Sequence, residues 1–455
     1  MILKTNLGDS SVYGGRPRFW FFLYQLICHL ILPFALVRLV LRARHDRSYL
    51  NHLQERLGFG YGHHVNQDAV WVHAVSVGET RAAQSLIEAY LARGDSILLT
   101  HMTLNGRRAG SQLFGDAIAE KRLMQVYLPY DLCWSVERFL QIFKPKLGLF
   151  METEAWPTIV FRCHELGLPL FLVNARLSEK SANRVRRFGG AGRALFQAFN
   201  GILAQTRLDA DRYRSLDVKD VEEVGNLKFD IRMDKGLVES GREWHLALKA
   251  EGRLMVCAAS TRDGEEAMIL DAWKELLESK AIQPAPILCI VPRHPERFSI
   301  AEKAIQNAGF ASRRRSTWRD NPTKIAVLEV LLGDSMGEMP MYYSASDLVI
   351  MGGSLLPFGG QNLIEACAVG CPVLVGEYTY NFQQATLDAL ASGAAIRIDI
   401  QTQKDEVGSL VLALKQLLSN THQIELMAKA ASAYSIQYQG ATKRVLALVD
   451  KKIGH

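Results

Sequence analysis

Short apolar runs alternate with amphipathic runs through most of this 455-residue chain. Residues 69–75 (AVWVHAV) predict a buried strand, and residues 79–92 predict a helix because their apolar side chains recur at helical spacing. Strands that alternate with helices in this way form parallel sheets with helices on both faces. The pattern therefore predicts a doubly wound α/β sheet, with further strands at 96–100, 124–128, 147–150, 170–173 and 201–204.

A polar stretch at 230–252 interrupts this alternation, which then starts again with strands expected at 254–259, 287–292, 324–328, 348–351 and 372–375. We therefore predict two successive Rossmann-like units joined at this stretch. Ligands of such sheets bind at the carboxyl ends of the strands, so we expect a ligand cleft between the units. A final helical run, roughly 423–452, could pack across both. The predicted division is 1–45 for an N-terminal anchor, 46–229 for the first domain and 230–455 for the second.

Composition narrows the class of protein. The 48% of hydrophobic and 22% of charged residues fit a globular protein with ample core. A formal charge of +6 is mild for this length and does not indicate nucleic-acid binding. The seven cysteines form no CxxC pair and match no zinc-site spacing, so we expect reduced, buried thiols and no metal site.

The N-terminal segment at 19–37 carries no formal charge and is just long enough to cross a bilayer as a helix. Arginines follow it from Arg38 to Arg56, so the positive-inside tendency predicts a cytoplasmic body. His29 and Pro33 weaken a spanning interpretation, and a helix in the membrane interface or a buried core helix is the alternative. The segment has no polar face that would predict docking on the body. We therefore expect the chain without residues 1–37 to fold as a soluble protein.

A glycine-rich loop stands between two predicted strands of the second half. It contains Gly352-Gly353-Ser354 and Gly359-Gly360-Gln361, and leads through Asn362-Leu363-Ile364-Glu365 into a helix. A helix N-terminus after such a loop can hold a phosphate, and Glu365 can accept hydrogen bonds from ribose hydroxyls. This arrangement predicts a nucleotide site. An ordinary βαβ crossover with glycines at its turns is the alternative.

Two acidic positions follow predicted strands of the first half. Glu79 opens the helix after the first strand, where a carboxylate can act as general base for a hydroxyl nucleophile; the alternative is simple complementarity to the helix dipole. Glu152 and Glu154 follow the strand at 147–150, where ligands bind, but they could equally be solvated loop charges.

Two basic positions have similar alternatives. Lys228 lies at the junction of the predicted domains and could neutralise a phosphate or carboxylate, or be an ordinary surface lysine. Arg293 lies between Pro292 and His294-Pro295 after a predicted strand. It could form charge-assisted bonds to a phosphate, or have a structural role.

Seven segments, taken in order together with the apolar N-terminus and its basic flank, resemble one family. They are ERLG (55–58), WVHAVSVGE (71–79), METEAWP (151–157), GNLKFD (225–230), VPRHPERF (291–298), GDSMGEM (333–339) and GGQNLIEA (359–366). The chain thus resembles the Kdo transferases (3-deoxy-D-manno-octulosonic acid transferases) of lipopolysaccharide synthesis over nearly its whole length. One position departs from the pattern: the family often has His where this chain has Gln361, so Gln361 is given no catalytic role.

The resemblance implies a GT-B glycosyltransferase with two Rossmann-like domains. It implies that Glu79 is the general base and that Glu152 and Lys228 stabilise the transition state. It also implies a CMP site formed by Pro292, Arg293, Met336, Gly337, Glu338, Asn362, Leu363, Ile364 and Glu365.

The implied reaction moves Kdo from CMP-Kdo to a lipid A precursor, lipid IVA, with inversion and without a cofactor or metal ion. The implied location is the inner membrane, with the catalytic body on the cytoplasmic side and the basic flank on the anionic lipid surface. Two alternatives stay open: a GT-B transferase that uses a UDP-sugar, and a non-catalytic, membrane-tethered nucleotide-binding module.

Overall fold

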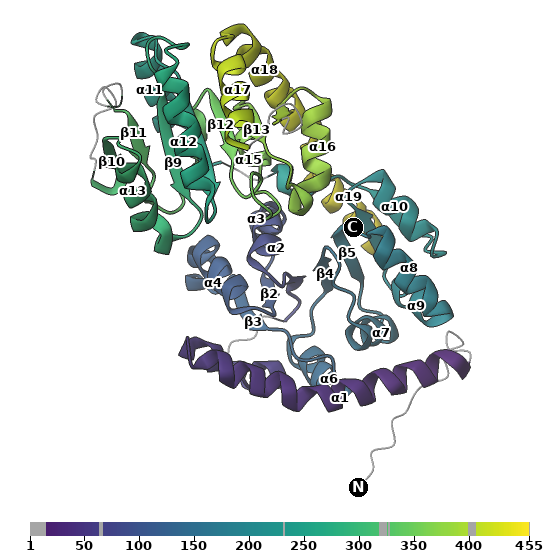
Figure 1. Cartoon of the computed structure of the whole chain (residues 1–455). Coiled ribbons are helices and arrows are strands. Elements are labelled where there is room, and N and C mark those ends of the chain that lie inside the picture. Colours follow the sequence, from purple (N-terminus) through teal and green to yellow (C-terminus); the bar gives the residue numbers. More distant parts are fainter. Residues whose placement is uncertain are drawn as a thin grey trace. The chain divides into compact units, whose positions relative to one another are not determined.

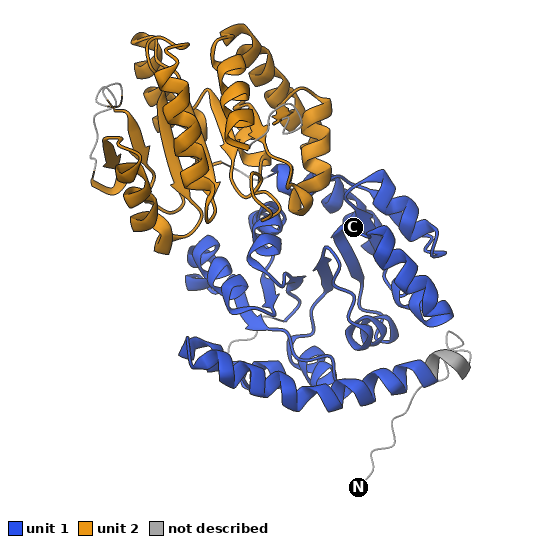
Figure 2. Cartoon of the chain, viewed as in Figure 1, with its two compact units in different colours: residues 1–231, 440–455 blue, residues 232–439 orange. Residues whose placement is uncertain are grey.

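The computed structural model describes residues 15–62, 67–230, 233–317, 325, 328–398 and 406–454. The chain forms two compact units (Figure 2): unit 1 comprises residues 1–231 and 440–455, and unit 2 comprises residues 232–439. Each unit is built on a seven-stranded parallel sheet with helices on both faces (Figure 1). The predicted α/β class with two doubly wound sheets is therefore confirmed.

The sheet of unit 1 has the strand order β3-β2-β1-β4-β5-β6-β7. Its strands are β1 (Val70–His73), β2 (Ile97–His101), β3 (Leu123–Tyr127), β4 (Leu147–Met151), β5 (Leu170–Ala175), β6 (Gly201–Ala204) and β7 (Val221–Glu223). Alternate side chains of β1 enter different cores, Trp71 on one face and Val72 on the other. The sequence pattern located six of these strands and missed β7, which has only three residues.

Helices cover both faces of this sheet because each has an apolar stripe that packs against the strands. The core that contains Trp71 is closed mainly by α6 (Cys133–Phe143), α7 (Pro157–Glu165) and α10 (Arg207–Arg214). The core that contains Val72 is closed mainly by α2 (Val77–Ala82), α3 (Gln84–Ala92) and the final helix α19 (Ala441–Ile453). The other helices of unit 1 are α1 (Gly15–Ala43), α4 (Leu104–Leu113), α5 (Gly115–Ala119), α8 (Glu179–Arg187) and α9 (Gly189–Gln197).

The final helix belongs to unit 1, which differs from the predicted second domain of 230–455. The single helical run expected at 423–452 is two helices, α18 (Thr421–Tyr438) in unit 2 and α19 in unit 1, separated at Gly440 with φ +90°. Val445 and Val449 of α19 are fully buried in the core of unit 1. The Asp230 carboxylate accepts the N–H of Gly440 at 2.6 Å, so the chain is tied back where it re-enters unit 1.

The apolar N-terminal helix α1 is also part of unit 1 (Figure 1). Residues Phe19–Ala43 are long and apolar enough to cross a membrane, with mean hydropathy 2.0. The expectation that this segment has no means of docking is wrong. Gln25 donates to Thr158 at 2.6 Å and to the carbonyl of Asp131 at 3.1 Å, and Tyr24 donates to the Asp131 carboxylate at 2.8 Å, so two polar side chains dock the helix although it has no polar face.

The sheet of unit 2 has the order β10-β11-β9-β8-β12-β13-β14. Its strands are β8 (Met255–Thr261), β9 (Ile287–Pro292), β10 (Ser312–Arg314), β11 (Val330–Leu332), β12 (Leu348–Met351), β13 (Val373–Val375) and β14 (Ala395–Arg397). Its helices are α11 (Lys235–Ala250), α12 (Glu265–Glu278), α13 (Phe298–Asn307), α14 (Met339–Ala345), α15 (Ile364–Ala368), α16 (Gln383–Ala391), α17 (Glu406–Leu418) and α18.

The chain passes from unit 1 to unit 2 between residues 231 and 232, at the start of the polar stretch at 230–252. The polar stretch at 230–252 is mostly a 16-residue helix, α11, whose polar surface hides the stripe of Trp244 and Leu248 that it buries. The strand expected at 324–328 falls largely on residues outside those described, and the strand that pairs with β9 is β11 at Val330–Leu332.

Candidate active site

The strand order of unit 1 reverses between β1 and β4, which pair in parallel. In open α/β sheets the loops after two such strands diverge and leave a crevice in which ligands bind. Glu79 follows β1, and Glu152 and Glu154 follow β4. Three acidic side chains thus stand at the switch point of unit 1.

Glu79 is held by the N-terminus of its own helix, α2. Ser76 caps that helix, and the carboxylate of Glu79 reaches back to accept the N–H of Val75 at 2.6 Å and the hydroxyl of Ser76 at 3.3 Å. The arrangement is a variant of the capping box in which the carboxylate accepts the N–H of Val75 instead of that of Ser76, and it fixes the carboxylate of Glu79 in place.

The electrostatic surroundings of Glu79 suit a general base. Burial is the main cause that raises its pKa to about 7; the Val75 N–H opposes the shift, and the negative charges of Glu152 and Glu154 add to it. A carboxyl group with a pKa near neutrality can accept a proton and release it again at physiological pH.

Glu152 and Lys228 lie together in unit 1. The ammonium of Lys228 donates to Oε1 of Glu152 at 3.1 Å, and both side chains are mostly buried, at 14% and 17% exposure. Lys228 is therefore no ordinary surface lysine, and Glu152 is no solvated loop charge. Arg176, which follows β5, places its guanidinium 3.7 Å from the other oxygen of Glu152. Sequence reasoning missed Arg176, although its position after a predicted strand could have indicated it.

His73 and Glu154 form a second polar group beside this pair. Glu154 accepts the indole N–H of Trp156 at 2.8 Å, and burial raises the pKa of its carboxyl. Nε2 of the buried His73 lies 3.9 Å from Glu154. Burial lowers the pKa of His73 to about 3, so the ring is neutral and this contact is not an ion pair. The positive charge at this edge comes from Lys228 and Arg176.

The sheet of unit 2 reverses between β8 and β12. The loops after these strands are joined by Glu265, which is fully buried at the start of α12. Its carboxylate accepts the N–H groups of Arg262 at 2.8 Å, Gly353 at 2.7 Å and Leu355 at 3.1 Å. Glu265 therefore sets the shape of the glycine-rich loop. The sequence offered no signal for this role because its partners are backbone groups.

The residues expected around the nucleotide occupy loops after strands of unit 2. Arg293 follows β9, and its N–H donates to the carbonyl of Thr261 at 3.0 Å. Pro292, the last residue of β9, is buried. In the segment after β11, Met336 is exposed, Gly337 has φ +86°, and Glu338 forms an ion pair with Arg315 at 3.2 Å.

Asn362 and Glu365 are brought together at the end of the glycine-rich loop. The amide of Asn362 donates to Oε1 of Glu365 at 3.0 Å and accepts the N–H of Ile364 at 3.1 Å. Leu363 and Ile364 are 1% exposed, so their side chains are packed inside unit 2. The helix that follows, α15, has only five residues, so its dipole is weaker than the pattern indicated.

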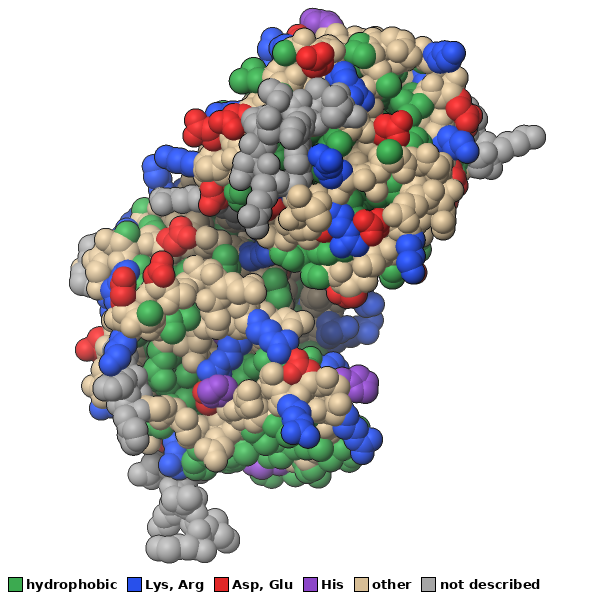
Figure 3. All heavy atoms as spheres, turned by 90° about the vertical axis from the view of Figure 1, so that its left-hand side faces the viewer, with side chains coloured by type: hydrophobic (Ala, Val, Ile, Leu, Met, Phe, Trp, Pro, Cys, Tyr) green, Lys and Arg blue, Asp and Glu red, His purple; other side chains and the backbone are tan. Residues whose placement is uncertain are grey.

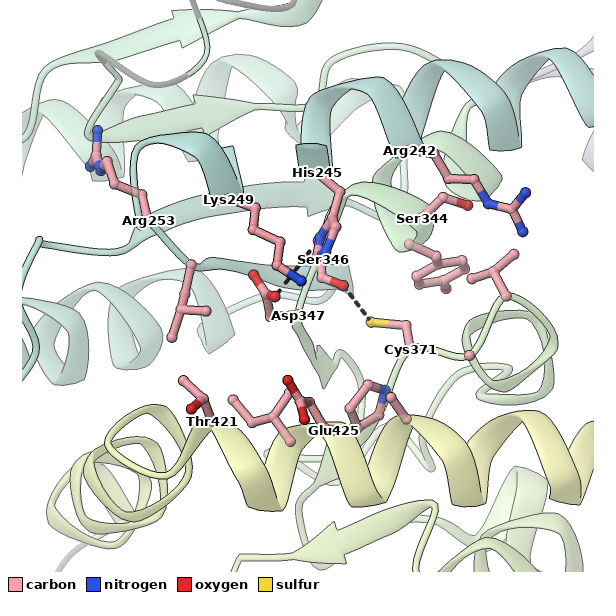
Figure 4. Close-up of a pocket in the computed structure, with 18 residues that line it drawn as sticks. Arg242, His245, Lys249, Arg253, Ser344, Ser346, Asp347, Cys371, Thr421 and Glu425 are labelled. Carbon is pink, nitrogen blue, oxygen red and sulfur yellow. Dashed lines mark hydrogen bonds and ion pairs between the residues drawn. The ribbon is translucent and has the colours of Figure 1, made fainter. Parts of the chain in front are cut away.

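A pocket of about 490 Å³ opens elsewhere in unit 2 (Figure 4). It lies where β8, β12 and β13 begin, and is lined by Arg242, His245 and Lys249 of α11 with Glu425 of α18. Asp347, which precedes β12, lies 3.8 Å from His245. The loops expected to hold the nucleotide follow the strands, so this pocket lies at the opposite edge of the sheet from them. Within the described residues, no group of three or more His, Cys, Asp or Glu side chains could hold a metal ion.

Comparison with solved structures defines the class of fold. The UDP-GlcNAc 2-epimerase of Neisseria meningitidis superposes with TM-score 0.53 and 16% identity, covering 84% of this chain and all of the other. A glycosyltransferase of Rickettsia africae has TM-score 0.55 and 8% identity, covering 85% and 99%. The chain therefore has the GT-B type of architecture, with two parallel-sheet α/β units.

Comparison of sequences defines the family. The sequence profile of the family described as 3-deoxy-D-manno-octulosonic-acid transferase (kdotransferase) matches residues 51–231. A 3-deoxy-D-manno-octulosonic acid transferase of Bordetella pertussis is 43% identical over 85% of this chain and 87% of its own length. One of Haemophilus influenzae is 30% identical over 94% and 98%. The chain belongs to the Kdo transferase family and is a glycosyltransferase of lipopolysaccharide synthesis.

Proposed function

We propose that this protein transfers Kdo from CMP-Kdo to a hydroxyl group of lipid IVA, with inversion at the anomeric carbon. The observation that carries this proposal is the carboxyl group of Glu79, fixed at the switch point of unit 1 with a pKa of about 7. An inverting transferase needs one base to deprotonate the attacking hydroxyl, and Glu79 has the position and the pKa for this step.

Glu152 and Lys228 stabilise charge during the same step. The Lys228 ammonium is fixed by its 3.1 Å bond to Glu152, so its positive charge is in place before the reaction begins. Charge that is already oriented costs little reorganisation when negative charge develops on the leaving phosphate. The family membership supports these roles, because both residues occupy the METEAWP and GNLKFD segments on which the resemblance rests.

The donor nucleotide binds at the carboxyl edge of unit 2. Arg293 supplies positive charge for the phosphate, and Glu365 accepts hydrogen bonds from the ribose. One feature supports the pairing of these residues: burial raises the pKa of the Tyr343 hydroxyl, the Glu365 carboxylate adds to that shift, and the Arg293 guanidinium opposes it. Both charges therefore act on the same buried hydroxyl, which supports the proposal that they contact one nucleotide.

Arg293→Ala and Glu365→Ala are each expected to raise the Kd for CMP about ten- to a hundredfold, since a charged hydrogen bond contributes roughly 1.5–3 kcal/mol. Isothermal calorimetry on the folded variants measures this directly. Arg313→Ala is the matched control, because Arg313 is an exposed arginine of the same unit that lies in the strand β10. Unchanged CMP affinity in both variants would refute this donor site.

Transfer is expected to proceed in EDTA, because Lys228 and Arg293 supply the positive charge that a divalent ion provides in metal-dependent transferases. The assay must use purified CMP-Kdo, so that a metal requirement of donor synthesis does not interfere. Activity that disappears on chelation and returns with magnesium would contradict this prediction.

Mass spectrometry of lipid IVA incubated with CMP-Kdo tests the function as a whole, since each transferred Kdo adds a fixed mass. Calorimetry with CMP and UDP separates the proposal from a transferase that uses a UDP-sugar. Nucleotide binding without a mass change in any acceptor would favour a non-catalytic module.

We further propose that the protein works at the inner membrane with both units in the cytoplasm, as the arginines from Arg38 onward indicate.

A further inference from the structure

Helix α1 is apolar on every side, yet its two faces have different surroundings. One face points into unit 1, where Leu39 and Ala43 are buried and Phe21 stacks edge-on against Phe161 at 5.9 Å. The other face, which we call the outward face, consists of exposed apolar side chains that recur every three or four residues: Phe19, Phe22, Leu26, Leu30, Phe34, Val37 and Leu41. A helix that is hydrophobic all round needs an apolar environment on both sides.

Polar bonds in the middle of the apolar segment hold α1 on unit 1. The Gln25 amide donates to the carbonyl of Asp131 and to the hydroxyl of Thr158, and it accepts the N–H of Cys133 at 3.1 Å. The hydroxyl of Tyr24 donates to the Asp131 carboxylate at 2.8 Å. We call these contacts the Asp131 latch.

The latch is part of the core of unit 1 and not a surface contact. The Asp131 carboxylate is 5% exposed and also accepts the N–H groups of Thr158 at 2.8 Å and Ile159 at 3.0 Å, which open helix α7. Losing Tyr24 and Gln25 would leave buried polar groups unpaired, which is costly.

The latch is incompatible with a helix that crosses a bilayer. Tyr24 and Gln25 lie inside the apolar segment, so a helix that crosses the bilayer would place them among lipid chains. Their partners lie at the starts of α6 and α7, so these two helices would have to enter the bilayer with them. Glu137 and Arg138 on α6 are exposed charged residues, which do not enter a hydrocarbon layer. With the latch closed, α1 lies along unit 1, as Figure 1 shows.

The exposed apolar surface continues from α1 onto the body of unit 1. Trp134, next to the latch residue Cys133, is 40% exposed and stacks on Phe59, with ring centroids 5.9 Å apart. Phe188, between α8 and α9, is 53% exposed and meets Trp20 edge-on at 6.4 Å. Figure 3 shows hydrophobic side chains gathered along the lower edge of unit 1, where α1 lies in Figure 1.

We propose that α1 lies in the plane of a phospholipid surface, with its outward face among the acyl chains, and that Trp134, Phe59 and Phe188 enter the same interface. Residues 15–44 contain no Asp or Glu but end in Arg38, Arg42 and Arg44, which attract anionic headgroups. A second copy of the chain is less suited than a phospholipid surface to cover the outward face. Pairing two such helices in either direction would bring arginines together, because Arg16 and Arg18 precede the segment as well.

Topology separates this proposal from a spanning anchor. The full chain is expressed with a protease-sensitive peptide tag at its N-terminus, and protease is added to inside-out inner-membrane vesicles and to cells with a permeable outer membrane. An in-plane helix keeps the tag on the side of the body, so both are digested in the vesicles and both are protected in the cells. A tag that is reached only from the side opposite to the body would overturn the proposal.

A matched pair of substitutions tests the latch. Gln25→Leu and His29→Leu add a similar apolar side chain one turn apart, but among the described residues the side chain of His29 bonds only to the carbonyl of Gln25 in its own helix. Gln25→Leu is expected to lower the Tm of the purified protein by about 4–10 °C, and His29→Leu to leave it within about 1 °C. Equal Tm values for Gln25→Leu and the parent would show that the latch does not hold the helix.

Vesicle binding tests the surface beyond α1. With the full chain and vesicles of phosphatidylcholine and phosphatidylglycerol, Trp134→Ser is expected to weaken binding about three- to tenfold. Ile436→Ser, at a 69% exposed position in unit 2, is the control and should change nothing. If Trp134→Ser binds vesicles as tightly as the parent, Trp134 does not enter the membrane interface together with α1. A stable dimer that ignores vesicles and is dissociated by Phe34→Asp would show that a second copy covers the outward face.

Discussion

Replacing Glu79 by glutamine is expected to lower kcat by about two to four orders of magnitude, the usual cost of losing a general base. The variant should fold, because glutamine also closes a capping box with Ser76. CMP affinity, measured by calorimetry, should stay near the parental value, because the proposed donor residues all belong to unit 2. Glu88→Gln is the control, since Glu88 is a carboxylate of the neighbouring helix α3 that accepts the amide of Gln84 at 2.8 Å.

The pH dependence gives this prediction a second measurement. The base must be ionised to accept a proton, so kcat/KM should rise tenfold per pH unit below about 7 and level off above it, following the pKa of Glu79. The proposal has the wrong base if Glu79→Gln keeps more than about a tenth of the parental kcat, or if its residual activity shows the same rise.

Lys228→Met is expected to lower kcat about a hundred- to a thousandfold, because it removes a preorganised positive charge while keeping most of the side-chain volume. It also removes the 3.1 Å partner of Glu152, which is 14% exposed, and leaves the guanidinium of Arg176 at 3.7 Å from its carboxylate. The thermal midpoint must therefore be measured beside kcat, so that loss of transfer is not confused with loss of fold.

A double-mutant cycle tests whether Glu152 and Lys228 act as a pair. If the Lys228–Glu152 bond positions the ammonium, Glu152→Gln and Lys228→Met should be far from additive in kcat. Lys219→Met, at an exposed lysine of unit 1, is the control. Additive effects, or a Lys228→Met enzyme with parental kcat and a normal midpoint, would remove Lys228 from the catalytic step.

The regular part of the fold could be predicted from local pattern. Strands such as 147–150 are buried on both faces and appear as continuous apolar runs between helices, so the class and most strands of both sheets were predictable. The pattern failed where apolar residues are few or the element is short. It missed the three-residue strand β7, and it gave α11 the appearance of a linker because most of its side chains face water.

The candidate site was predicted as a list of positions but not as an arrangement. The family segments indicated Glu79, Glu152 and Lys228 separately. That Lys228 and Glu152, 76 residues apart, share a bond depends on how the chain after β7 returns to β5, where Asn174 accepts the N–H of Leu227 at 3.0 Å. The roles of Arg176 and Glu265 were not predicted, because each depends on partners that are distant in the sequence.

The sequence by itself determined that residues 19–37 are apolar, that two α/β units follow, and that they carry the motifs of the Kdo transferase family. Only the tertiary structure decided where the two ends of the chain belong. Helix α1 packs on unit 1 because the carboxylate of Asp131, more than one hundred positions away, accepts a hydrogen bond from the hydroxyl of Tyr24. Helix α19 returns to unit 1 because the side chains of Val445 and Val449 are buried in the core of that unit. Both placements depend on long-range contacts, which leave no periodic signal in the segments that make them.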